Sequence, residues 1–139
     1  MIVSGKILVC AAMGLLLAAY ANFAPTALQS PIIADYIKNH FVREIVFGLA
    51  LTTWTISSTL SANSRRNVLE VGVAGSIVVA PFWIATVFGW STDGLTEVWG
   101  ESIDEAAAYA LHSSQIALFV IGFALLAKGI GEQNLPPSP

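Results

Sequence analysis

The chain has 139 residues, of which 55% are hydrophobic and 11% are charged, and its formal net charge is −3. Soluble globular proteins carry about a quarter charged residues because their surfaces face water, so this composition excludes a soluble globular domain. Six scattered basic residues also exclude a nucleic-acid-binding surface. A single cysteine, Cys10, excludes an internal disulfide.

Four long apolar stretches follow one another along the chain, and we predict an all-α membrane protein with a four-transmembrane-helix bundle. They cover residues 7–24, 45–60, 68–89 and 106–127. A helix of about 20 apolar residues crosses the hydrocarbon layer. The second stretch is the shortest and holds six Ser or Thr residues, whose hydroxyls can bond to carbonyls of their own helix. We expect it to be a span buried among its neighbours.

The first stretch also fits a cleavable signal peptide. Lys6 precedes the apolar run, and Ala19-Tyr20-Ala21 offers small residues at a cleavage position. We expect the segment to remain in the molecule as the first span.

The connections on the outer side have distinct characters. Ser30-Pro31 is typical of an N-cap followed by proline at the first helical position. Apolar residues then recur at helical spacing up to Phe41, so we predict a short interfacial helix between the first two spans. The connection at 90–105 has five carboxylates and no basic residue.

Basic residues predict the orientation. Lys6, Arg65, Arg66 and Lys128 fall on one side of an alternating four-helix topology, against two basic residues on the other side. The positive-inside rule then places both termini in the cytoplasm, with the protein in a bacterial inner membrane. Glu70 follows Arg66 by four residues, which predicts a local ion pair. We predict one transmembrane domain over residues 1–132 and a disordered, proline-rich tail over residues 133–139.

The chain contains two similar helix pairs. Phe47-Gly48-Leu49-Ala50-Leu51 matches the later segment 121–125, which reads Ile-Gly-Phe-Ala-Leu. This similarity favours an architecture of two repeated pairs as a variant of the bundle.

The segment 75–83 reads Gly-Ser-Ile-Val-Val-Ala-Pro-Phe-Trp. It resembles the SPW-repeat family of bacterial membrane proteins, in which a glycine-bearing helix runs into a Ser-Pro-Trp motif and a second apolar helix carries another glycine. The resemblance covers roughly residues 66–129, and only Pro81 of the motif is retained, within Ala80-Pro81-Phe82. It implies a topology and no activity.

Small residues recur at intervals of about four in the predicted spans. Such ridges let helix backbones approach closely, within the bundle or against a partner's helix. Pro81 cannot donate a backbone hydrogen bond, so we predict a kink in the third span. We predict helix packing at Gly14, Ala18, Gly72, Ser76, Ala80, Ala110, Ser114 and Gly122.

His112 is the candidate cofactor-binding residue. It lies about two turns inside the fourth predicted span, where an ionisable side chain suggests function. A neutral imidazole can ligate the metal of a haem or a chlorophyll-type pigment. The segment 108–112 is similar to the pigment-binding helix of purple-bacterial antenna proteins, which implies a photosynthetic or electron-transfer complex and (bacterio)chlorophyll or haem as cofactor. The alternative is a histidine bonded to Ser113, Ser114 or a hydroxyl of the second span.

The sequence shows neither a credible nucleophile with a base nearby nor a cluster with metal-ligand spacing, so we predict no catalytic residue, no metal site and no enzyme. Near-complete apolarity and the small-residue ridges favour an accessory or scaffolding subunit that packs against larger membrane proteins or itself, surrounded by lipid. The alternatives are a pigment- or haem-binding subunit and a small channel or carrier.

Overall fold

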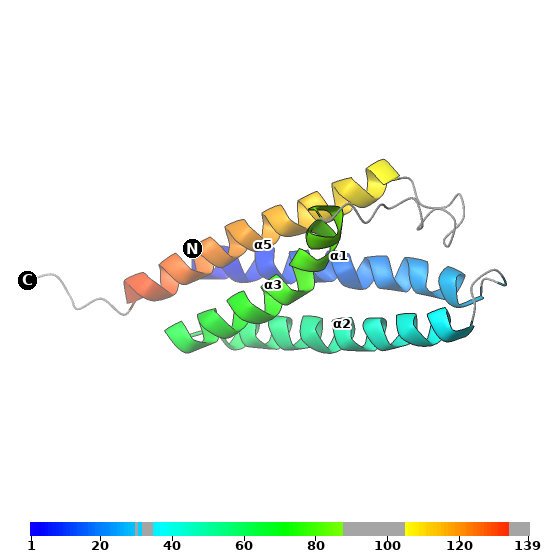
Figure 1. Cartoon of the computed structure of the whole chain (residues 1–139). Helices are drawn as coiled ribbons and strands as arrows, with labels where there is room; N and C mark the ends of the chain where they lie inside the picture. Colours follow the sequence, from blue (N-terminus) through cyan, green and yellow to red (C-terminus); the bar gives the residue numbers. More distant parts are fainter. Residues whose placement is uncertain (30, 32–34, 88–104, 134–139) are drawn as a thin grey trace, which may run out of the picture.

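The computed structural model describes residues 1–29, 31, 35–87 and 105–133, and four α-helices fill almost all of this part of the chain (Figure 1). They are α1 (Ile2–Gln29), α2 (Asp35–Ser61), α3 (Arg65–Val87) and α5 (Glu105–Gln133). The predicted all-α class is confirmed. Each helix also extends beyond at least one end of its predicted span, because the polar residues that flank the apolar stretches remain helical.

Consecutive helices run in opposite directions and lie beside one another. α1 packs most extensively against α5; α2 packs against α1 and α3, and α3 against α5. The start of α1, the α2–α3 turn and the end of α5 lie at one end of the molecule (Figure 1). We call it the basic end, because the four basic residues predicted to share one side lie in these segments.

Three helices contain segments long and apolar enough to cross a membrane: Ile2–Asn22, Arg65–Ile84 and Ala106–Gln133. Three of the four predicted spans therefore lie in helices of sufficient length and apolarity. α2 has 27 residues but no sufficiently apolar window, because its Ser and Thr residues lower the hydropathy.

The predicted interfacial helix is not a separate element. Residues from Asp35 onward form the first turns of α2, which continues to Ser61. The reason is local: no proline or glycine occurs between Asp35 and Phe47, so nothing breaks the helix between the amphipathic segment and the apolar stretch. Ser30, the acidic connection up to residue 104 and the tail after Gln133 lie outside the described residues.

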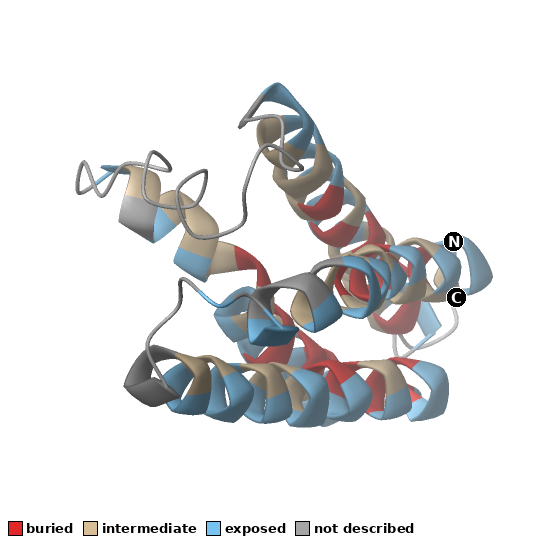
Figure 2. Cartoon of the chain, turned by 90° about the vertical axis from the view of Figure 1, so that its right-hand side faces the viewer, coloured by how far each residue is buried: buried red, intermediate tan, exposed pale blue. Residues whose placement is uncertain are grey.

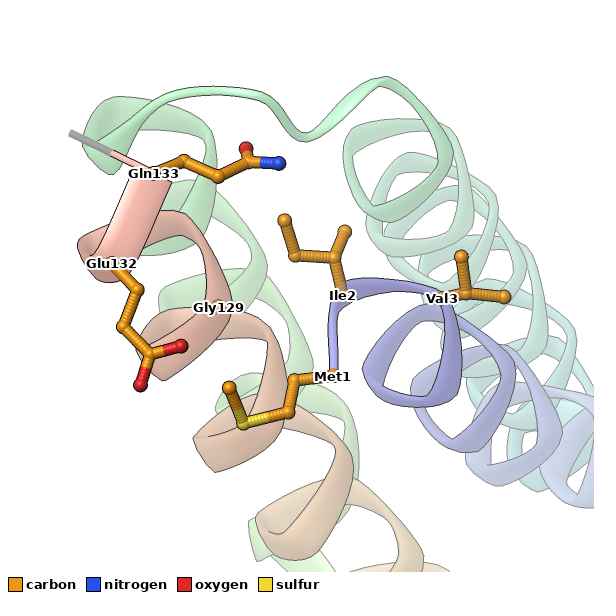
Figure 3. A pocket seen from close by; sticks show the side chains of 6 residues that line it. All are labelled: Met1, Ile2, Val3, Gly129, Glu132 and Gln133. Atoms are coloured by element: carbon orange, nitrogen blue, oxygen red, sulfur yellow. The ribbon is translucent and has the colours of Figure 1, made fainter.

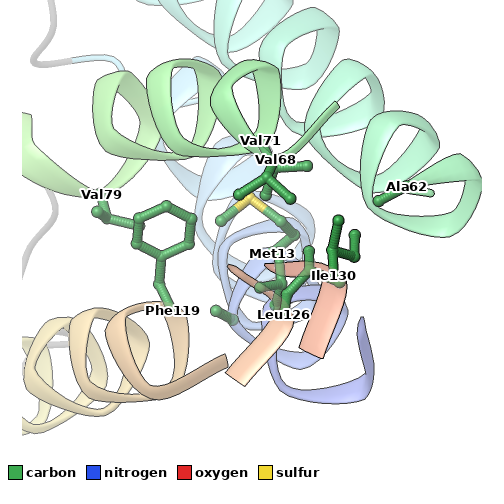
Figure 4. Close-up of a cluster of buried hydrophobic side chains, with 10 residues drawn as sticks. Met13, Ala62, Val68, Val71, Val79, Phe119, Leu126 and Ile130 are labelled. Carbon is green, nitrogen blue, oxygen red and sulfur yellow. The ribbon is translucent and has the colours of Figure 1, made fainter. Parts of the chain in front are cut away.

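The core lies where the inward faces of the helices meet (Figure 4). Buried residues recur at alternating intervals of three and four along each helix, as in left-handed bundles, and Figure 2 shows them on the inner sides of the ribbons. The cluster comprises Val9, Ala12, Met13, Ala62, Val68, Val71, Val79, Phe119, Leu126 and Ile130.

Glycines bring the backbones of α1 and α5 into direct contact. A Cβ atom added to Gly5 would lie 2.6 Å from the Leu126 backbone nitrogen, and one added to Gly122 would lie 2.8 Å from the Val9 backbone nitrogen. Helices without a Cβ at the crossing can approach closely, and packing of this kind holds helices together in lipid.

Polar contacts at the basic end connect the helix termini. The Lys6 Nζ donates a 2.6 Å hydrogen bond to the Leu60 carbonyl, so a cation neutralises the C-terminal end of α2. Ser64 caps α3, because its hydroxyl oxygen accepts a 3.3 Å hydrogen bond from the backbone N–H of Asn67. The predicted local ion pair is confirmed, with Arg66 Nε 3.2 Å from Glu70 Oε1.

Candidate functional site

Aromatic and polar side chains gather where the C-terminal part of α3 meets the N-terminal part of α5. Phe82 and Trp83 come from α3, and Tyr109, His112 and Gln115 come from α5, where intervals of three place them on one helix face. We call these five residues the histidine cluster. It lies toward the end of the bundle opposite the basic end.

His112 is held by two contacts. Its ring stacks on Phe82 with the centroids 3.9 Å apart and the planes 17° from parallel. Its Nδ1 lies 3.2 Å from Gln115 Oε1, and an amide oxygen can only accept, so Nδ1 carries the proton and donates. In a neutral imidazole this leaves Nε2 as the nitrogen with a free lone pair. The hydrogen bond predicted to Ser113, Ser114 or the second span goes to Gln115 instead.

The other aromatic rings join α3 to α5. Phe82 meets Tyr109 edge-on at 5.4 Å and Trp83 edge-on at the same distance, while Trp83 lies 6.2 Å from Tyr109. Edge-to-face pairs contribute about 0.5–1.5 kcal/mol beyond the area they bury. The cluster therefore fixes the orientation of the His112 ring and the position of the end of α3 together.

Pro81 lies inside α3, immediately before Phe82. It leaves the Ile77 carbonyl without its helical donor. In Figure 1 the C-terminal turns of α3 leave the direction of its earlier turns.

Three buried polar atoms have no hydrogen-bond partner within the described part of the chain: Gln115 Nε2, Trp83 Nε1 and Thr52 Oγ1. Gln115 is 1% exposed and Thr52 is fully buried. Sequence reasoning did not select Gln115. The signal that could have found it is a carboxamide three residues after a histidine, inside an apolar stretch where such a side chain is costly.

The neighbouring hydroxyls of α2 differ from that of Thr52. Thr55 donates to the Leu51 carbonyl at 2.8 Å, and Thr59 donates to the Thr55 carbonyl at 2.7 Å. These bonds satisfy the two hydroxyls inside their own helix, as predicted for the Ser and Thr residues of this stretch.

The predicted packing residues divide into two groups. Gly122 is buried against Leu8 and Val9, Gly72 lies under the Phe123 ring, and Ala80 is half-buried. The others face outward from the described bundle, and a Cβ added to Gly14 would meet no atom within 4 Å. The outward-facing group is Gly14, Ala18, Ser76, Ala110 and Ser114.

Sequence reasoning missed three packing glycines in addition to Gly5. Gly48 lies under the Tyr20 hydroxyl, Gly75 lies under the Phe119 ring, and Gly129 lies against Ile2. Their neighbours along the chain resemble those of the predicted glycines, so only the register between helices distinguishes them.

An open depression at the basic end lies between the first turn of α1 and the last turns of α5 (Figure 3). It contains no aromatic or histidine side chain, so it does not match a pigment site. Its lining is Met1, Ile2, Val3, Gly129, Glu132 and Gln133.

Among the residues that the structure describes, no three His, Cys, Asp or Glu side chains lie close enough to hold a metal ion. Comparison with protein-family models, with curated proteins and with solved structures finds no match to this chain. The resemblances to the SPW-repeat family and to antenna helices therefore stay predictions from the sequence.

Proposed function

We propose that the chain is a non-catalytic accessory subunit of a membrane protein complex, with all four helices crossing the bilayer and the basic end in the cytoplasm of a bacterial cell. Its role is to pack against other integral membrane proteins. The observation that carries this proposal is the open surface of α1 around Gly14.

Helix directions support a membrane path for α2. The chain starts and finishes its described helices at the basic end, so it passes between the two ends an even number of times. If α1, α3 and α5 cross the bilayer, α2 returns through the same layer beside α1 and α3. Its exposed positions include large apolar side chains suited to lipid, namely Val46, Phe47 and Trp54.

We define the outer α1 face as Ala11, Gly14, Ala18 and Ala21. This face is suited to packing against the helix of a partner protein. All four residues are exposed, and their intervals of three, four and three match the seam of a left-handed helix pair. Lipid chains pack against large and small side chains alike, whereas a second helix gains contact area where small residues let its backbone approach.

Blocking this face tests the proposal. Gly14→Leu adds bulk where an added Cβ meets nothing within 4 Å, so the isolated chain should keep its fold. Native electrophoresis of mildly solubilised membranes should show the wild type in a larger assembly and the variant released from it. Val73→Phe enlarges an exposed side chain of α3 and serves as the matched control. A wild type that migrates as a free monomer, or equal release by both variants, contradicts the proposal.

A second candidate function is binding of a haem or chlorophyll-type pigment through His112. The hydrogen bond from Nδ1 to Gln115 favours it, because metal-ligating histidines donate their other ring N–H to a fixed acceptor that sets the tautomer. His112 would hold the metal through Nε2, Phe82 would keep the imidazole in place, and the bound group would supply visible absorption.

An absorption spectrum of the protein purified from its native membrane tests this candidate. We expect a visible band that is lost in His112→Ala and kept in Ser113→Ala, whose side chain is exposed on the neighbouring position. A colourless preparation that retains its partner proteins would refute it.

A further inference from the structure

Contacts between α1 and α5 place Gln115 at a definite level of the bundle. Gly122 lies beside Val9, with 2.8 Å between an added Cβ and the Val9 backbone nitrogen. The two helices are antiparallel, so seven residues forward from Val9 and seven residues back from Gly122 arrive at the same level. These steps lead to Leu16 and Gln115, both of which are buried.

Contacts between α1 and α2 place Thr52 near the same level. The Tyr20 hydroxyl lies over Gly48, 2.6 Å from an added Cβ. Four residues back along α1 and four residues forward along α2 lead to Leu16 and Thr52. Because a tyrosine side chain spans about one helical turn, Thr52 lies within about one turn of the level of Gln115. The two residues belong to α2 and α5, each of which packs mainly against α1 and α3.

Unpaired polar atoms of these two residues have complementary chemistry. Gln115 Nε2 can only donate, and its amide is held by the bond between Oε1 and His112. The Thr52 hydroxyl can accept and donate, and it makes no bond to its own helix, unlike Thr55 and Thr59. A donor left unpaired in an apolar interior destabilises the folded state.

Apolar residues from the other two helices lie at the level of Gln115. Phe119 covers Gly75, so four residues along each antiparallel helix bring Val79 to the level of Gln115. Val79 is 5% exposed and Leu16 is 7% exposed, and neither side chain can hydrogen-bond. Neither Leu16 nor Val79 can therefore supply a hydrogen-bond partner to Gln115 or Thr52.

We propose that Thr52 and Gln115 bind one water-sized, neutral molecule in the centre of the bundle, and that this molecule is water. Water accepts from the Gln115 amide and can either donate to the Thr52 hydroxyl or accept from it. A cation would face the Gln115 N–H donor, and an anion would be uncompensated at membrane depth. The bound water would link α2 to α5, each of which packs mainly against α1 and α3, and would hold the polar side of α2 inside the bilayer. This site requires no partner protein, and it rests on the proposed function only for the passage of α2 through the bilayer.

Solid-state NMR of the full chain in bilayers tests the site directly. Magnetisation transferred from water should reach the side-chain amide of Gln115, whose signal is assigned by its loss in Gln115→Met. The transfer should fall at least severalfold in Thr52→Val, persist in Thr52→Ser, which keeps a hydroxyl, and persist in Thr59→Val, whose hydroxyl bonds to its own helix. Absence of transfer in the wild type, or equal transfer in Thr52→Val, would overturn the proposal.

Unfolding equilibria provide a second and independent measurement. If one molecule bridges the two groups, the effects of Thr52→Val and Gln115→Met on the unfolding free energy are not additive. The unfolding constant of the double variant should differ about fivefold from the value expected from the two single variants. The pair Thr59→Val and Gln115→Met should combine additively within about twofold. Additivity in both pairs would mean that Thr52 and Gln115 are satisfied separately, and the shared site would be refuted.

Discussion

Replacing Gly122 by alanine should separate α1 from α5, whereas the same replacement at Gly14 should be neutral or stabilising. The new Cβ at Gly122 would lie 2.8 Å from the Leu8 Cβ, 2.8 Å from the Val9 nitrogen and 3.0 Å from the Gly5 oxygen. Two of these atoms belong to the backbone, so no side chain can rotate away to make room. At Gly14 the new Cβ meets nothing within 4 Å.

The magnitude follows from overpacking and helix propensity. Forcing one extra carbon into a packed contact costs about 1–3 kcal/mol, and a clash with backbone places Gly122→Ala at about 2–3 kcal/mol. Alanine is preferred over glycine in a helix by about 0.5–1 kcal/mol, which Gly14→Ala should gain without a clash. Both variants gain this propensity, so they should differ in unfolding free energy by the clash alone, about 2–3 kcal/mol, or roughly 30- to 150-fold in the unfolding constant.

Denaturant titration of both variants in one detergent, followed by far-ultraviolet circular dichroism, measures this difference. The substitutions are chemically identical and both lie in apolar helices, so effects of detergent and hydrophobicity cancel. Equal unfolding free energies for the two variants, or a more destabilised Gly14→Ala, would refute the register between α1 and α5.

Two further predictions concern the basic end. Lys6→Met removes the cation that donates to the last turn of α2, so the unfolding free energy should fall by about 1 kcal/mol in denaturant titration. Lys128→Met serves as the control, because Lys128 makes only an exposed ion pair with Glu132, 4.0 Å apart. It should change the unfolding free energy by less than about 0.5 kcal/mol. Ser64→Ala removes the N-cap of α3 and should cost about 1 kcal/mol. Amide exchange should then accelerate at Asn67, and unchanged exchange there would show that the cap does not hold this terminus.

Local features of the fold could be predicted from the sequence because local chemistry decides them. The apolar stretches predicted the helices, and the interval of four between Arg66 and Glu70 predicted their ion pair. The merged helix α2 was missed because a change from amphipathic to apolar pattern was interpreted as a boundary. A helix ends at a breaker or a cap, and residues 36–46 contain neither proline nor glycine.

The candidate site was predicted only in part. His112 could be selected from the sequence because a histidine is unusual in an apolar stretch. Its partners could not: Phe82 belongs to the site through a contact between helices, and Gln115 through its burial beside His112. Thr52 has the same local surroundings as Thr55 and Thr59, and only the absence of a bond to its own helix separates it from them.

The sequence by itself determined that this chain forms long apolar helices with four of its six basic residues at one end. Only the tertiary structure decided that Gly5 and Gly122 are crossing points while Gly14 faces outward. The physical reason is that lipid dissolves every apolar face of a helix equally well, so hydrophobicity does not select the inward face. Close packing between particular backbones selects it, and that depends on residues far apart in the chain.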